Sequence, residues 1–362
     1  MEARRRATEL RCWEELGAAK VVSSGEVAEE MSLGVGRTNH NFIATTAHGR
    51  TLFVRIGADL PAYGVARSRE QSATRAAAMA GVGPSVVHTE PDALVCDFIR
   101  GTTLTAQDVK AACAVADDPL LALVAASVRK LHAWPVPAEL RSTSGWAPPD
   151  LVSWLALAEE SKYVRLPIVA EGQELVEAVE KAAGPVTMPL AFCHFDLLPD
   201  NVVQSQCVRD GDRVWLVDYE YAAAGQPLVD LAILSMGSVP TLHTSASPSP
   251  STLPTTQLEV SRPDVLRCSL HRCELSPSED ARLLAAYFQK PAVDHSLMRK
   301  FGAIRLLACL RETLWGVVAE VSGSSALSME EARAYTDKNF AAFQAARDAF
   351  FASRTDNSTN VV

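Results

Sequence analysis

The chain has 362 residues, of which 48% are hydrophobic and 21% are charged, and its formal net charge is −9. This length favours two lobes or domains, and the composition is typical of a folded globular protein. The acidic balance argues against a nucleic-acid-binding protein, which needs a basic face to neutralise phosphates.

The sequence contains no apolar stretch long enough to span a bilayer. The first twenty residues predict an amphipathic helix rather than a signal peptide. The eight cysteines are scattered along the chain, which favours reduced thiols and a cytoplasmic location. The segment CSLHRC at 268–273 offers half of a metal site, but no second half accompanies it.

The first hundred residues predict a β-rich lobe. NFIATT and TLFVRI flank a turn that contains Gly49, which is typical of a hairpin. A helix is predicted over 65–83, where the chain reaches a glycine followed by Pro84. Two more short strands, SVVHTE and ALVCDFI, follow on either side of a Pro-Asp turn.

From about residue 104 the patterns are mainly helical, with one β-hairpin formed by NVVQSQ and VWLVDYE. The segment 238–263 is rich in Ser, Thr and Pro and predicts a disordered insertion, with a phosphorylated or docking loop as the alternative. The predicted domains are therefore 1–100 and 101–362. The helices predicted in the second domain cover 105–116, 119–133, 149–162, 170–183, 278–290, 295–320 and 328–352.

Polar residues interrupt two apolar runs in the stretch CHFDLLPDN at 193–201. Asp196 and Asn201 belong to this loop, and Asp218 ends the strand that returns from the following hairpin. Because a hairpin brings its two ends to one edge, we expect these three side chains to lie together. Asn201 and Asp218 offer hard oxygen ligands for Mg²⁺, and Asp196 can accept a proton from a hydroxyl, as phosphoryl transfer requires. The alternative is three unrelated turn and strand-end residues.

HFDLLPDN resembles the H-x-D-x-x-x-x-N catalytic loop of the kinase-like phosphotransferases, the group of aminoglycoside phosphotransferases and choline/ethanolamine kinases. VDYEYAAAGQPLVDLA at 217–232 resembles the D-[FY]-E-Y segment and the downstream D-[IL]-A of choline/ethanolamine kinases. The resemblance extends over most of the chain from about Leu33. It implies an α+β, bilobal protein-kinase-like fold with a small β-rich N-terminal lobe and a larger, mainly helical C-terminal lobe.

The same resemblance implies a function and a set of roles. The reaction would be ATP- and Mg²⁺-dependent phosphorylation of a small amino alcohol in phospholipid head-group synthesis, with choline first and ethanolamine second. Asp196 would be the catalytic base, and Asn201 and Asp218 would hold Mg²⁺. His194 and Asp230 would support the catalytic loop.

The N-terminal lobe would hold the nucleotide. SLGVGRTNHNF resembles the family's G-G-x-T-N turn, whose backbone N–H groups approach phosphates. Arg55 lies on the strand that supplies a phosphate-binding cation, with Glu70 as its partner on the next helix. LVCDFIRG would be the hinge against adenine. The predicted nucleotide site comprises Gly34, Gly36, Asn39, Arg55, Glu70, Asp97 and Ile99.

The resemblance assigns the acceptor to Glu220, Tyr221 and Trp315, because a trimethylammonium group is bound by aromatic faces and nearby carboxylates. Val318 stands where the family's W-G-x-W segment has its second Trp, which leaves other acceptors open. The alternatives are a kinase of the thiamine or aminoglycoside type and a catalytically inactive kinase-like scaffold. The predicted partner is a small-molecule amino alcohol, with no nucleic acid and no membrane span expected, and a homodimer is left open.

Overall fold

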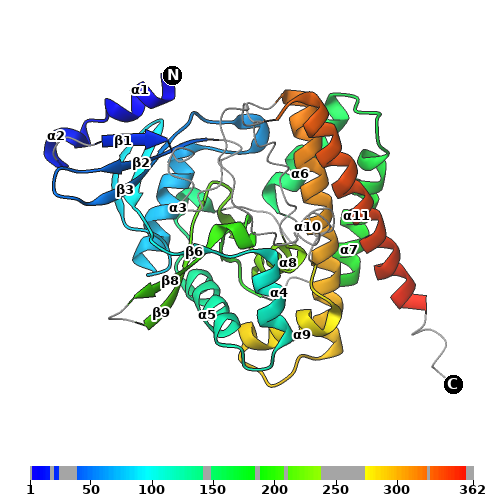
Figure 1. Cartoon of the computed structure of the whole chain (residues 1–362). Helices are drawn as coiled ribbons and strands as arrows, with labels where there is room; N and C mark the ends of the chain where they lie inside the picture. The colour runs from blue at the N-terminus through cyan, green and yellow to red at the C-terminus, as the bar shows by residue number, and fades with distance from the viewer. Residues whose placement is uncertain are drawn as a thin grey trace, which may run out of the picture.

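The structure, a computed structural model, describes residues 2–16, 20–23, 39–141, 148–183, 188–207, 211–237, 274–323 and 327–355. The predicted insertion at 238–263, the CSLHRC segment and the phosphate-turn residues Gly34 and Gly36 lie outside these residues. Figure 1 shows a sheet-containing lobe at the N-terminal end and a larger helical lobe beside it. The predicted α+β, bilobal fold is confirmed.

The N-terminal lobe contains one antiparallel sheet with the strand order β1-β2-β3-β5-β4. The hairpin predicted around Gly49 joins β2 to β3, and Gly49 adopts a φ of 79°, which favours glycine. The strands are β1 (Lys20–Ser23), β2 (His40–Thr45), β3 (Thr51–Ile56), β4 (Val86–Glu90) and β5 (Ala93–Asp97).

The two faces of this sheet have different partners because side chains alternate along a strand. On β3, Leu52, Val54 and Ile56 are buried in a core that also contains Leu10 and Trp13 from the N-terminal segment. Arg55 therefore points to the opposite face. Helix α3 (Arg67–Met79) lies on that side of β3, since its Glu70 contacts Arg55.

The predicted N-terminal helix is two short helices, α1 (Glu2–Thr8) and α2 (Cys12–Leu16). The chain breaks between them where the backbone N–H of Arg11 donates to Glu90 at the sheet edge, at 3.0 Å. The break was not predicted because the periodicity of the sequence carries no information on this tertiary hydrogen bond.

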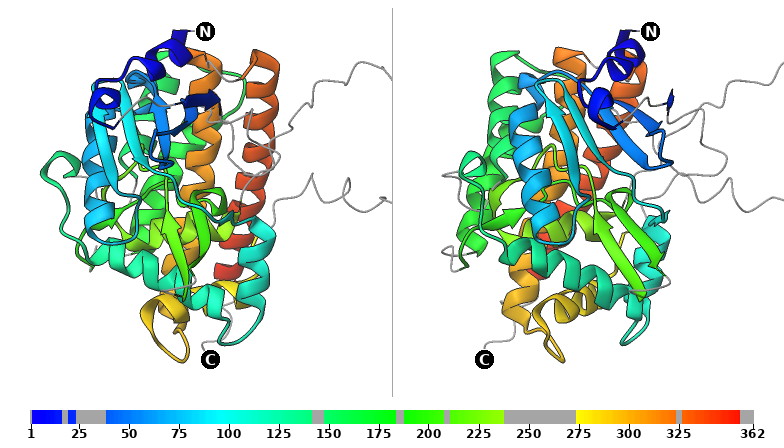
Figure 2. Two further views of the ribbon diagram at one scale, coloured as in Figure 1. Left: turned by 60° about the vertical axis from the view of Figure 1, so that its left-hand side comes forward. Right: turned by 90° about the vertical axis from the view of Figure 1, so that its left-hand side faces the viewer.

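The C-terminal lobe contains the helices predicted beyond residue 104, each ending within three residues of its expected bounds. The two longest, α10 and α11, lie side by side, as both views in Figure 2 show. One further helix, α8, was not predicted because it is buried on all sides and so has no polar face to create a 3.6-residue period. The helices are α4 (Ala106–Ala114), α5 (Pro119–Ala133), α6 (Pro149–Glu160), α7 (Ile168–Ala183), α8 (Pro227–Met236), α9 (Pro277–Phe288), α10 (His295–Ser322) and α11 (Met329–Thr355).

Two small sheets lie beneath the N-terminal lobe and frame the predicted catalytic loop. One pairs β7 with β10, and the other has the order β6-β8-β9, in which β8 and β9 are the predicted hairpin. The described residues also contain the short 3-10 turns η2 (Pro61–Tyr63), η3 (Ala138–Leu140) and η4 (Pro199–Asn201). The strands are β6 (Thr102–Thr103), β7 (Ala191–Cys193), β8 (Val202–Cys207), β9 (Gly211–Leu216) and β10 (Ala223–Gly225).

Within the described residues, none of the helices taken singly has the length and apolar character needed to cross a membrane. The bent pair α4 and α5 meets that criterion only when its two members are counted together.

Candidate active site

The predicted catalytic loop leaves β7 and is fixed at its start by a carboxylate from α8. Asp230 accepts hydrogen bonds from the backbone N–H of His194 at 2.7 Å and of Phe195 at 2.8 Å. Phe195 has a φ of 58°, a conformation that non-glycine residues rarely adopt. Its ring lies so close to Gly225 that a Cβ there would be 2.1 Å from the ring. The loop is therefore held in an unusual backbone shape by buried neighbours.

His194 points back into the protein and connects this loop to the hairpin. Its Nε2 lies 2.9 Å from the backbone oxygen of Val217, and its Nδ1 accepts the backbone N–H of Asp196 at 3.3 Å. These two bonds require a neutral ring with the proton on Nε2. Burial lowers the pKa of His194, which favours the same neutral form. The placement agrees with the predicted support of the loop.

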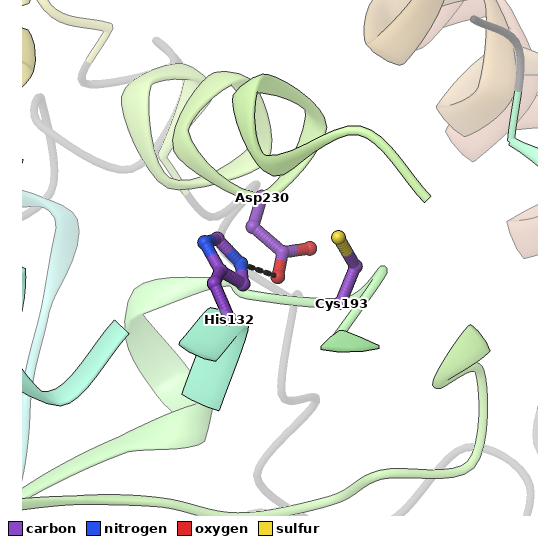
Figure 3. A group of neighbouring side chains, drawn as sticks. All are labelled: His132, Cys193 and Asp230. Atoms are coloured by element: carbon purple, nitrogen blue, oxygen red, sulfur yellow. Dashed lines mark hydrogen bonds and ion pairs between the residues drawn. The ribbon is translucent and has the colours of Figure 1, made fainter. Parts of the chain in front are cut away.

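Asp230 lies between His132 and Cys193, as Figure 3 shows. The three offer one potential metal-ligating atom each, all within 4.8 Å of one another. The carboxylate of Asp230, however, already accepts three hydrogen bonds, the third from His132 Nε2 at 2.9 Å. His132 Nδ1 lies 2.8 Å from the hydroxyl of Tyr287, and burial keeps the Cys193 thiol protonated by raising its pKa. The group therefore supports the loop through hydrogen bonds, since the ring of His132 and the carboxylate of Asp230 already have hydrogen-bond partners.

Asp196, Asn201 and Asp218 meet at one end of the β8–β9 hairpin, as the sequence predicts. The strand register pairs Val202 with Leu216, and the backbone N–H of Val217 donates to Asn201 at 3.0 Å. Asn201 Nδ2 donates to the backbone oxygen of Asp196 at 2.8 Å and to its carboxylate at 3.1 Å. Both of these side-chain hydrogen bonds use Nδ2, so they do not engage the amide oxygen of Asn201.

The atoms of Asn201 and Asp218 fit a magnesium ion, because an amide oxygen and a carboxylate are the hard oxygen ligands that Mg²⁺ prefers. Asp218 has a φ of 69° and leaves 24% of its side chain exposed, so its carboxylate is presented at the surface of the site. Arg55 Nη1 donates to it at 2.7 Å. Burial by itself would raise the pKa of Asp218, but the charge and the hydrogen bond of Arg55 lower it, so the carboxylate stays ionised.

Arg55 and Glu70 form a buried ion pair between β3 and α3. They are 5% and 1% exposed, so each requires the other's charge. Because Arg55 also contacts Asp218, it links the N-terminal sheet to the hairpin of the other lobe. The structure thus brings together the two residues that the sequence assigned to the phosphates.

Arg67 belongs to the same network, and the sequence analysis did not identify it. Its Nη1 donates to Glu70 at 2.7 Å and to Glu220 at 3.2 Å, and the residue is 3% exposed. Glu220, which was assigned to the acceptor, also accepts a hydrogen bond from Asn39 at 3.0 Å. These contacts place Glu220 between the lobes. The sequence held one indication of this role, because Arg67 and Glu70 are three residues apart on one helix and can therefore form an ion pair.

We predict that Arg67→Gln lowers the free energy of unfolding by about 2 kcal/mol, because it removes a charged donor from two buried carboxylates. Arg75→Gln is the matched control, since Arg75 is an exposed residue of the same helix whose guanidinium contacts Thr89. Urea unfolding of both variants measures the difference. Equal stability of the two would contradict a structural role for the buried network.

Asp97 ends β5 and Ile99 lies between β5 and β6, and the side chains of these two predicted hinge residues differ in environment. The carboxylate of Asp97 accepts hydrogen bonds from Arg50, at 2.9 Å from Nε and 2.6 Å from Nη2. It is therefore part of a surface ion pair, and the backbone N–H of Asp97 donates to the carbonyl oxygen of Ser85 at 2.9 Å. Ile99 is half-buried in the segment that leads to the second lobe.

Aromatic residues gather around Tyr221, one of the predicted acceptor-binding residues. Trp315 Nε1 donates to the hydroxyl of Tyr221 at 3.0 Å, so the structure brings these two predicted residues together. Trp154 of α6 packs edge-on against Tyr221, with ring centroids 6.2 Å apart. Arg311 of α10, which no sequence motif indicated, lies over both Trp154 and Tyr221. Burial raises the pKa of Asp196 well above its ordinary value, and the charge of Arg311 opposes that rise.

Comparison with known proteins identifies a family and a set of structural relatives. The phosphotransferase enzyme family matches residues 31–247, more than half of the chain. No curated protein sequence matches.

Three solved structures share the fold across both lobes. A choline/ethanolamine kinase family protein from Mesorhizobium loti has a TM-score of 0.63 and 24% identity, covering 95% of this chain and 93% of its own. Choline kinase from Cryptosporidium parvum has a TM-score of 0.61 and 14% identity, with 96% and 94% covered. LicA in complex with AMP has a TM-score of 0.60 and 17% identity, with 96% and 99% covered. At sequence identities of 24%, 14% and 17%, these similarities show the common fold and nothing finer.

Proposed function

Because this chain belongs to the phosphotransferase enzyme family, we propose that it transfers the γ-phosphoryl group of ATP to the hydroxyl of a small amino alcohol. The observation that carries the proposal is the convergence of Asp196, Asn201 and Asp218 on a site that Arg55 reaches from the other lobe. The names of the relatives support the acceptor class, with choline placed first and ethanolamine second by the sequence resemblance. The AMP complex of LicA supports nucleotide binding.

In this proposal the hydroxyl oxygen of the acceptor forms a bond to the γ-phosphorus, the bond to the ADP oxygen breaks, and the hydroxyl proton passes to the Asp196 carboxylate. Asn201 Nδ2 orients that carboxylate through the hydrogen bond at 3.1 Å. Asn201 and Asp218 would hold Mg²⁺, which neutralises phosphate charge when bound. Arg55 contributes a second positive charge beside Asp218, and its pairing with Glu70 fixes its direction.

Most of the catalysis proposed here is positioning. The loop is fixed by Asp230 and by His194, so the base and the Mg²⁺ ligands keep their separation without help from the substrate. Phosphorylated amino alcohols serve as precursors of phospholipid head groups, so we propose that role for the product.

The test is a phosphoryl-transfer panel with ATP and Mg²⁺ and with choline, ethanolamine, thiamine and an aminoglycoside as acceptors. We expect turnover of the amino alcohols and its loss when a chelator removes Mg²⁺, because Asn201 and Asp218 then lack the ion that neutralises the phosphates. If only thiamine or the aminoglycoside is phosphorylated, the proposed amino-alcohol acceptor is wrong, but the proposed phosphoryl transfer from ATP still holds. Failure to bind ATP with Mg²⁺ would favour the inactive scaffold instead.

A further inference from the structure

Arg311 occupies the aromatic surface beside the catalytic loop. It is 1% exposed on α10, and its guanidinium carbon lies 5.2 Å from the ring centre of Trp154 and 4.9 Å from that of Tyr221. Both distances are within the range of cation–π attraction. Two faces that could receive a quaternary ammonium group are therefore covered by a cation of the protein itself.

The position of Arg311 is fixed by carboxylates as well as by rings. Its Nε donates to Asp150 at 2.8 Å, and its Nη1 donates to the neighbouring Glu312 at 3.1 Å. Glu312 in turn accepts the hydroxyl of Tyr335 at 2.8 Å. A guanidinium with two charged partners and two aromatic faces loses several interactions if it moves, so a trimethylammonium group would not displace it readily.

Apart from Arg311 and the aromatic rings, this surface is formed by carboxylates, which are acidic and accept hydrogen bonds. Asp150 and Glu312 form ion pairs with the guanidinium, and the charge of Arg311 also acts on Asp196. This excess of carboxylates still favours a cationic acceptor over an anionic one. Among the described residues, the second carboxylate oxygen of Asp150 has no hydrogen-bond partner although it is buried. A buried acceptor of this kind is stabilised by an N–H donor, and a trimethylammonium group has none to offer.

We propose that Arg311 determines acceptor specificity: it covers the aromatic faces of Trp154 and Tyr221, so the acceptor's ammonium group is bound through its N–H donors by the nearby carboxylates, and primary amino alcohols are preferred to quaternary ones. The inference rests on the proposed function and narrows its acceptor class. It moves ethanolamine-type acceptors ahead of choline.

The wild-type enzyme tests this directly with ethanolamine and its N-methyl, N,N-dimethyl and N,N,N-trimethyl derivatives, since each methyl group removes one N–H donor and adds bulk. We expect kcat/KM to fall along the series, by about tenfold or more from the first member to choline. A rise along the series overturns the inference and leaves the proposed function intact. Turnover of none of the four overturns both.

Arg311→Met tests the residue, because methionine keeps a long side chain and removes the charge. We expect the ratio of kcat/KM for ethanolamine to that for choline to fall by about tenfold, as the aromatic faces become available. Arg305→Met is the control, since Arg305 lies on the same helix and pairs with Glu274 and Asp280 instead. An unchanged ratio in Arg311→Met, or an equal change in both variants, overturns the assignment. If Arg311→Met does not fold, the kcat/KM values of the wild type for ethanolamine and its N-methylated derivatives test the inference.

Discussion

Replacing Asp196 by asparagine is expected to lower kcat by about a thousandfold, because the amide cannot accept the proton of the acceptor hydroxyl. Asparagine has nearly the same shape, and its side-chain oxygen can still accept the hydrogen bond that Asn201 Nδ2 now gives to the carboxylate. The loop should therefore keep its geometry, and the KM for ATP should change by about threefold at most. Steady-state kinetics, ATP binding by calorimetry and thermal unfolding separate these effects.

Asp200→Asn is the matched control for that experiment. Asp200 lies in the same loop, four residues further on, and is exposed. We expect its kcat to stay within about twofold of the wild type, since surface substitutions of this kind have small effects. If Asp196→Asn retained near-normal turnover, the role of general base would have to pass to another group. If both variants lost activity equally, the effect would belong to the loop rather than to the carboxylate.

The local patterns of the sequence predicted most of the fold. Helices with one apolar face produce a 3.6-residue period, and the hairpins have Gly-containing turns, so both leave a signal within about ten to twenty residues. Helix α8 left no such signal, because all of Pro227–Met236 is buried. The break in the N-terminal helix was also missed, since its cause is Glu90, a residue of the sheet edge that lies 79 positions further along the chain.

The predicted site shows the same division between local and distant information. Asp196, Asn201 and Asp218 belong to one loop and one hairpin, so their meeting follows from strand pairing. Arg67 and Arg311 have partners that the chain supplies from 153 and 161 residues away, Glu220 and Asp150, and no short motif encodes those contacts.

Contacts between residues that are distant in sequence matter most for the choice of acceptor. Sequence resemblance placed choline first on the strength of Tyr221 and Trp315, and it had no means of showing that a guanidinium lies over the ring of Tyr221. The specificity of a pocket depends on every side chain that shares it, including those that belong to no motif.

Asp230→Asn should damage both stability and turnover, because one carboxylate fixes the catalytic loop. Asp230 is fully buried and accepts two backbone N–H groups and His132 Nε2. An amide in its place would turn an N–H group toward one of these donors, so we expect a loss of about 3 kcal/mol in the free energy of unfolding. The loosened loop should lower kcat by about tenfold to a hundredfold even where the protein stays folded.

The pH dependence identifies the carboxylate as the source of that stability. Burial alone would raise the pKa of Asp230, but the hydrogen bonds and charges around it, led by His132, lower it below the ordinary value. A carboxylate with a lowered folded-state pKa stabilises the protein above the unfolded-state pKa of about 4, and the stabilisation is lost as the pH falls towards the folded-state value. The gap in unfolding free energy between the wild type and Asp230→Asn should thus be full at neutral pH and shrink below about pH 4.

Asp280→Asn separates the loss of a buried carboxylate from the loss of the loop's anchor. Asp280 is 4% exposed and is bound by Ser235 and Arg305, with no contact to the catalytic loop among its hydrogen bonds within the described part of the chain. We expect this variant to lose stability while its kcat, measured well below its unfolding temperature, stays within about twofold of the wild type. A similar fall of kcat in both variants would mean that turnover follows global stability. A fall in Asp230→Asn alone would show that the position of the loop limits the rate, because only that variant releases the backbone N–H groups of His194 and Phe195.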